Sequence, residues 1–183
     1  MEKELIRLIG KERYLHCIRV METAIILGEK YNVDIEKIKT AALLHDCSKF
    51  KDKLELLKKA SEFDIMLDAV TEHNIELLHG PVGAKIAEIE YKIKDIEILD
   101  SIRYHTTARE NMTILDKIIY ISDYIEPKRN FAGVEEVRQL TFEDIDIGIS
   151  LALDNTIKFL IEMDRVIHLD TIKARNYFKI YEK

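Results

Sequence analysis

The chain has little cysteine, proline and glycine, and it has no tryptophan. Its two cysteines, Cys17 and Cys47, are too few for a framework of structural disulfides, so we expect free buried thiols. No apolar run approaches the roughly 18 residues that a membrane span needs. Charged residues at positions 2–4 stand where a secretory signal would need its apolar region. We therefore expect a cytoplasmic protein without a membrane partner.

Positive charge is scarcer than negative charge, because the 183 residues carry a formal net charge of −6. This balance argues against broad binding to nucleic acid, although it leaves room for a local cationic pocket that holds a small polyphosphate. Hydrophobic residues make up 47% of the chain, which is enough for one sizeable core at this length. We predict a single domain over residues 1–183.

Apolar residues recur with a helical period along most of the chain, whereas the strict alternation typical of strands is almost absent. The sequence therefore predicts an all-α fold. The expected helices cover residues 2–9, 12–31, 35–47, 53–59, 62–73, 81–92, 96–105, 114–125, 134–140, 145–163 and 171–181. Expected boundary signals are N-caps at Asp34, Asp95, Thr113 and Asp170, Pro81 in a first turn after Gly80, and Pro127 beyond a last turn.

The adjacent pair His45-Asp46 follows an apolar stretch that ends at Leu44. Ile38, Ala41 and Ala42 precede His45 at helical spacings, so the imidazole belongs to the core-facing stripe. A buried imidazole beside a carboxylate costs stability unless something binds it. Such a pair is typical of a hydrogen-bonded helix terminus, and it also suits a metal ion.

Two further polar side chains fall on apolar helix faces. His16 shares a stripe with Val20 and Ala24, and Asp123 lies one turn after Ile119. Alone, the histidine would be an ordinary core residue and the aspartate a helix-terminal acceptor. Together with the histidine–aspartate pair, they form a mixed nitrogen and oxygen set that suits Fe, Mn, Co, Ni or Zn.

This order of one His, a His-Asp pair and a later Asp resembles the HD superfamily of metal-dependent phosphohydrolases. The resemblance narrows to the bacterial YqeK-type family and extends from about residue 13 to residue 176. The strings that carry it occupy residues 43–49, 77–84, 102–107, 121–127 and 153–157. The family resemblance implies an HD-domain helical bundle that hydrolyses diadenosine tetraphosphate symmetrically to two ADP with a metal-activated water.

The resemblance also implies roles for particular residues. The metal, iron in type, would be held by His16, His45, Asp46 and Asp123. His79 and His105 would contribute to a second metal position or to phosphate binding, and the proposed catalytic residues are Asp46, His79 and His105.

Substrate binding is expected to involve the phosphates and one nucleoside. Arg13, Lys49 and Arg129 are candidate phosphate clamps, because fixed cations offset charge that shifts in phosphoryl transfer. The loop 126–133, which contains Arg129, reads first as a surface loop and second as a phosphate-facing loop. The other expected substrate contacts are His16, Asp46, Cys47, Ser48, His79, His105, Thr106, Asp123, and the stretch Val166, Ile167, His168, Leu169, Asp170 and Thr171, whose backbone would approach the nucleoside. For His168, a structural or helix-entry role is the alternative.

Three other functions remain open at this point. The chain could be another HD phosphohydrolase that acts on deoxynucleotides or cyclic nucleotides, or a nucleotide-sensing or partner-binding module without turnover. A thiol enzyme that uses Cys47 is a more distant alternative, because no base is positioned by the local sequence. Apolar helix faces also permit a homodimer.

Overall fold

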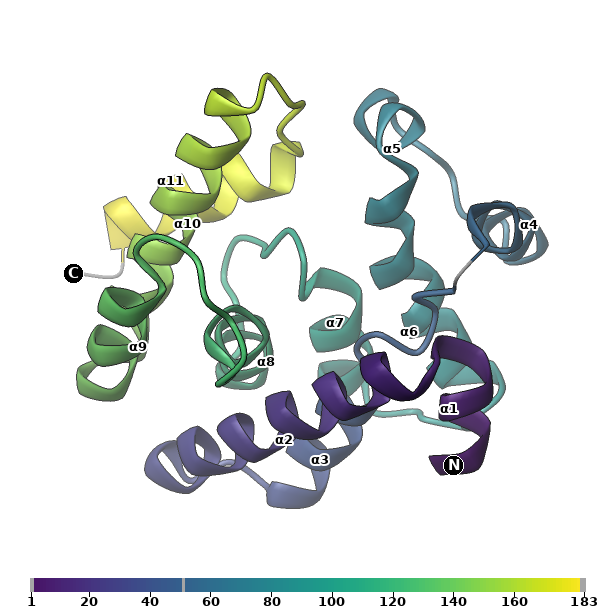
Figure 1. Cartoon of the computed structure of the whole chain (residues 1–183), viewed down its shortest axis with the longest axis horizontal. Helices are drawn as coiled ribbons and strands as arrows, with labels where there is room; N and C mark the ends of the chain where they lie inside the picture. The colour runs from purple at the N-terminus through teal and green to yellow at the C-terminus, as the bar shows by residue number, and fades with distance from the viewer. Residues whose placement is uncertain (1, 51, 182–183) are drawn as a thin grey trace.

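The computed structural model describes residues 2–50 and 52–181, and within them it contains helices and no strand. The elements are α1 (Glu2–Ile9), α2 (Lys11–Tyr31), α3 (Ile35–Leu44), α4 (Lys53–Glu62), α5 (Ala69–His73), the 3-10 helix η1 (Ile75–Leu78), α6 (His79–Ile89), α7 (Ile96–Tyr104), α8 (Ile114–Ile125), α9 (Val134–Glu143), α10 (Ile145–Glu162) and α11 (Leu169–Tyr181). The prediction of an all-α fold is confirmed (Figure 1). Within these two ranges, no helix has the length and apolar character that crossing a membrane requires.

Helix boundaries agree best where the sequence carries a strong cap. The bounds of α8 match the predicted 114–125, and Thr113 forms a capping box with Asp116 at its start. Asp34 and Asp95 also cap their helices, since each side chain accepts a hydrogen bond from a backbone N–H two residues later. Pro127 follows Glu126, the C-cap of α8. These local signals need no tertiary contact to act.

Three predicted boundaries are wrong. The helix expected over 62–73 is only α5, because α4 ends at Glu62 with Phe63 as its C-cap, Asp64 takes a left-handed φ of 52°, and Asp68 caps the later start. The helix expected over 35–47 ends at Leu44, which leaves His45 as its C-cap. The predicted N-cap Asp170 lies inside α11.

That helix begins at Leu169, and the ring of the preceding His168 accepts a hydrogen bond from the backbone N–H of Asp170. His168 therefore occupies the capping position that the sequence analysis gave to Asp170. Differences of similar size lie at other ends: α4 and α9 each run three residues beyond their predicted last residue, and the helix expected over 81–92 is α6, which begins two residues earlier and ends three residues earlier. Ordinary disagreement at helix ends is about one or two residues.

Helix α8 lies near the centre of the bundle in Figure 1, with α1–α3 below it and α9–α11 to its left and above it. It packs against α2, α3, α7, α9 and α10. Its side chains Leu115, Ile118, Ile119 and Ile121 are fully buried, and each such burial contributes about 1.5–3 kcal/mol. Because α8 is surrounded, the polar residues on its last turn are held in a fixed position relative to α2 and α3.

Helices α6 and α7 approach closely at Gly80. A Cβ atom at this position would collide with the backbone carbonyl oxygen of Arg103, so only glycine allows this spacing. His79 precedes Gly80, and His105 directly follows α7. The close contact between the helices therefore sets the distance between these two histidines.

Candidate metal centre

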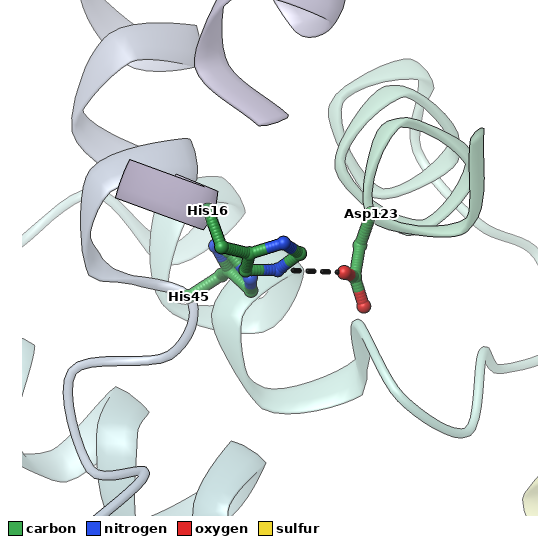
Figure 2. A group of neighbouring side chains, drawn as sticks. All are labelled: His16, His45 and Asp123. Atoms are coloured by element: carbon green, nitrogen blue, oxygen red, sulfur yellow. Dashed lines mark ion pairs between the residues drawn. The ribbon is translucent and has the colours of Figure 1, made fainter. Parts of the chain in front are cut away.

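Six polar side chains from five places in the chain meet beside α8. Helix α2 supplies one, the turn after α3 supplies two, the start of α6 and the end of α7 supply one each, and the last turn of α8 supplies the sixth. Figure 2 shows three of them pointing toward one another. This His/Asp cluster comprises His16, His45, Asp46, His79, His105 and Asp123.

Asp46 lies between two pairs of histidines. Its Oδ2 atom is 3.8 Å from Nε2 of His16 and 3.6 Å from Nε2 of His45. Its Oδ1 atom is 3.4 Å from Nε2 of His79 and 3.6 Å from Nε2 of His105. One carboxylate thus offers a separate oxygen to each pair, and the side chain is only 4% exposed.

Three of the histidines are oriented by the same type of hydrogen bond to the backbone. The Nδ1 atoms of His45 and His105 each lie 2.7 Å from a backbone carbonyl oxygen three residues earlier, and Nδ1 of His79 makes the equivalent contact. A carbonyl oxygen only accepts, so each Nδ1 donates and a neutral ring keeps its lone pair on Nε2. The carbonyl groups belong to Ala42, Ile102 and Glu76. All three lone pairs therefore point into the cluster.

His16 is held instead by Glu126, a residue that the sequence analysis missed. Nδ1 of His16 is 3.3 Å from Oε1 of Glu126, whose Oε2 accepts hydrogen bonds from Arg19 and from the backbone N–H of Lys128, each at 2.8 Å. Burial alone would raise the pKa of Glu126, but these donors hold it below its usual value. The available signal was its position three residues after Asp123 on the same apolar helix, just before Pro127.

The protonation states suit metal ligation. Burial lowers the pKa of His45 to about 4 and the pKa of His79 to about 3. For Asp46 and Asp123, burial would raise the pKa, but the neighbouring histidines hold both values well below the usual range, and Arg129 adds to the effect at Asp123. At neutral pH these groups are neutral imidazoles and carboxylates, which are the forms that bind metals.

The buried lone pairs are not satisfied by the protein. Nε2 of His16 and Nε2 of His45 are buried without a hydrogen-bond partner, although Nε2 of His16 lies 3.0 Å from Oδ1 of Asp123 (Figure 2). The ligand atoms of these three residues lie within 4.8 Å of one another. Leaving such atoms unpaired costs about 1–3 kcal/mol each. The donor set therefore fits a divalent cation.

The lone pairs of His79 and His105 also face each other without enough hydrogen-bond donors. Nε2 of His79 is 3.0 Å from Nε2 of His105, and the hydroxyl of Thr106 lies 3.0 and 3.1 Å from the two atoms. The hydroxyl has one proton and can donate it to only one of the two lone pairs. A cation that accepts both lone pairs would resolve this conflict. His45, Asp46 and His105 form a second compact set of ligand atoms.

Two arginines and a lysine reach the cluster from its rim. Arg13 contacts Oδ2 of Asp46 at 3.0 Å, and Arg129 contacts Oδ1 of Asp123 at 2.6 Å. Nζ of Lys49 is 3.5 Å from Nδ1 of His79. The structure thus brings all three predicted phosphate clamps to one place, and the loop 126–133 faces the cluster through Arg129.

Cys47 and Ser48 connect the turn after α3 to α6. The thiol of Cys47 donates to the carbonyl of Gly83 at 3.5 Å, and the hydroxyl of Ser48 donates to the carbonyl of His79 at 2.5 Å. Both side chains are completely buried, and burial raises the pKa of the Cys47 thiol. This environment disfavours the thiolate that a thiol enzyme needs. The two residues position α6 and His79.

Two residues of the stretch 166–171 line a cavity whose lining includes none of the six cluster residues. His168 and Asp170 line a cavity of about 220 Å³ together with Thr106, and Nε2 of His168 pairs with Asp68 at 3.2 Å. Residues 166–171 are all described by the structure, and only His168 and Asp170 among them line this cavity. Val166 and Leu169 are exposed, Ile167 is half-buried and Thr171 is buried. The nucleoside contact expected of this stretch stays a prediction.

Comparison with known proteins defines the class. Residues 13–128 match the family model named HD domain. The chain belongs to the HD-domain family, which confirms the resemblance predicted from its motifs.

Individual relatives narrow the comparison. The chain is 41% identical over 169 residues to a Bacillus subtilis protein named symmetrical bis(5'-nucleosyl)-tetraphosphatase, covering 92% of this chain and 90% of the relative. A protein of the same name from Halalkalibacterium halodurans is 42% identical over 179 residues, covering 96% and 93% of the two chains. A crystal structure from Clostridium acetobutylicum, described as a predicted HD superfamily hydrolase involved in NAD metabolism, superposes with a TM-score of 0.94 at 41% identity, covering 100% of this chain and 96% of the other.

Proposed function

We propose that this protein hydrolyses diadenosine tetraphosphate symmetrically and releases two molecules of ADP. The observation that carries the proposal is the His/Asp cluster, in which one buried carboxylate presents its two oxygens to two pairs of histidines. Relatives of about 40% identity that bear the name of this activity extend over nearly the whole chain, and they support the choice of substrate.

The proposed cofactor is a divalent metal, and we propose iron. His16, His45, Asp46 and Asp123 would hold it, and a second ion would take the facing lone pairs of His79 and His105. When bound, such a metal lowers the pKa of water and polarises a phosphoryl oxygen. Nitrogen and carboxylate ligands of this kind suit iron and its neighbours in the first transition row.

The residues around the cluster would place the substrate. Arg13, Lys49 and Arg129 would hold the phosphate chain, and their charges would offset the negative charge that moves to the leaving oxygen. In the net reaction, water adds to one of the two inner phosphorus atoms, and the bond to the oxygen between them breaks. Each half then leaves as ADP.

Asp46, His79 and His105 are the proposed catalytic residues. Oδ1 of Asp46 lies 3.4 Å from Nε2 of His79 and 3.6 Å from Nε2 of His105, so these three side chains could together orient the attacking water molecule. The hydroxyl of Thr106 contacts both rings and would help to fix their orientation. A cytoplasmic location and a homodimer stay predictions from the sequence.

A substrate panel tests this proposal. Metal-loaded protein would be given diadenosine tetraphosphate, deoxynucleoside triphosphates and cyclic nucleotides under identical conditions. We expect preferential turnover of the dinucleotide. Preference for a deoxynucleotide or a cyclic nucleotide would establish the alternative phosphohydrolase, and tight binding without turnover by a fully loaded protein would establish a sensor.

A further inference from the structure

A groove of about 580 Å³ runs along the second half of α10. Its walls come from α10, from the last turn of α8 and from the loop that joins α8 to α9. These elements lie in the left half of Figure 1. Phe131 and Phe159 line it and are 42% and 52% exposed. Large aromatic side chains that remain this accessible in a concave surface are typical of a ligand site.

The groove adjoins a cavity that reaches the His/Asp cluster. A smaller cavity of about 220 Å³ is lined by His105, Thr106, Asp123 and Arg129, and its far side is formed by Tyr124, Phe131 and Thr156. The last three residues also line the groove. A ligand anchored at the cluster can therefore extend along α10 without leaving the protein surface.

A second cavity meets the surroundings of the cluster at Thr106, whose hydroxyl contacts His79 and His105. It is the cavity lined by His168, Asp170 and Thr106, and Thr106 also belongs to the small cavity next to the groove. One nucleoside is expected in the region of His168, from the family resemblance of residues 166–171. A symmetrical substrate has a second nucleoside, at the same distance from the bond that breaks, and it needs a second place to bind.

The groove has the chemistry of a nucleobase site. The ring of Tyr124 meets Phe131 edge to face, with centroids 5.1 Å apart and an interplanar angle of 88°, which fixes one aromatic wall. The amide of Asn155 and the carboxylate of Glu162 lie in the same lining and match the donors and acceptors on a base edge. From Thr156 to Glu162, α10 rises about 9 Å, so the groove extends well beyond the cluster.

We propose that this groove binds the second adenosine of the dinucleotide substrate, with its base against Phe159 and Phe131 and its phosphates leading past Arg129 to the His/Asp cluster. This inference rests on the proposed function. The cavity at His168 would hold one adenosine, and the α10 groove would hold the other.

Phe159→Ala tests the proposal, and Ile161→Ala is the matched control. Both residues are exposed on α10, at 52% and 64%, but Ile161 is not in the groove lining. Loss of a stacking ring is expected to lower kcat/KM for diadenosine tetraphosphate about 5- to 100-fold, mostly through KM. Phe159→Trp should restore it, and Ile161→Ala should match the wild type.

Calorimetry of diadenosine tetraphosphate binding to the same set of proteins tests the groove separately from the proposed hydrolytic function. If the wild type binds the dinucleotide without hydrolysing it, the proposed function fails, while weaker binding by Phe159→Ala would still support the groove. If kcat/KM and affinity of Phe159→Ala stay within twofold of the wild type, the proposal is overturned. A change in oligomeric state alone, seen by sedimentation, would overturn it in favour of a contact between copies of the chain.

Discussion

Nδ1 of His16 donates a hydrogen bond to Glu126, 110 residues later in the chain, across 3.3 Å. Arg19 and the backbone N–H of Lys128 hold the carboxylate in place. Because an ionised Glu126 can only accept, a His16 ring with one proton carries it on Nδ1. Its Nε2 lone pair then faces Asp123, at 3.0 Å. A buried carboxylate outside the proposed ligand set thus orients one of the ligands.

Glu126→Gln should therefore weaken metal binding without removing a ligand. Carboxylates that orient a ligating histidine typically contribute 10- to 100-fold to metal affinity, and we expect a loss in that range, with activity restored by excess metal. Titration of the metal-free protein measures it. Glu135→Gln, at an 80% exposed side chain on α9, is the control, and equal affinity in both variants would rule out this role for Glu126.

Metal content should show whether a separate ion binds next to each of the two carboxylate oxygens of Asp46. Asp46→Ala removes the oxygens that face both histidine pairs, so we expect loss of all bound metal and all activity. The double variant His79→Ala/His105→Ala should keep the ion held by His16, His45, Asp46 and Asp123, at about half the metal content of the wild type. Elemental analysis of folded protein gives the stoichiometry. Full metal content in the double variant would exclude a second ion there.

Cys47→Ala should keep both metal and activity. The thiol is buried, its pKa is raised, and it donates to a carbonyl rather than facing a base. We expect a loss of roughly 1–2 kcal/mol in unfolding free energy, as for other small deletions in a core, and kcat within a few-fold of the wild type. Cys17→Ala is the matched buried control. Abolished turnover with metal content intact would revive the thiol mechanism.

Gly80→Ala should impair activity by separating α6 from α7. The added Cβ meets the carbonyl of Arg103, which cannot move without shifting α7, and overpacking of this kind costs about 1–3 kcal/mol. Gly28→Ala meets only the flexible end of Ile38, so it serves as a control for packing changes away from the site. Activity measured well below both melting temperatures should fall in Gly80→Ala alone.

Much of the fold could be predicted from local signals. The helix over 114–125 carries strong periodicity and a capping box at Thr113, and its bounds are those predicted. The helix expected over 62–73 failed because apolar side chains there, such as Ile65 and Leu67, pack against the core from non-helical backbone. Apolar periodicity predicts which side chains are buried, but it does not show whether the backbone that carries them is helical.

The candidate site divides in the same way. Helical faces predicted that His16 and His45 would be buried, and they are 6% and 0% exposed. Their convergence with Asp123 depends on the packing of α2, α3 and α8, which spacing along the chain does not encode. Glu126 was missed because its partner is far away in sequence. The α10 groove was also missed, since it exists only between two separate elements.

Product analysis on one metal-defined preparation tests the central claim most directly. Protein purified without chelator would be incubated with diadenosine tetraphosphate, before and after metal removal and after iron is restored, and the products separated. We expect ADP as the only nucleotide product, loss of turnover on stripping the metal, and recovery with iron. AMP together with ATP, or turnover unchanged after metal removal, would contradict the account.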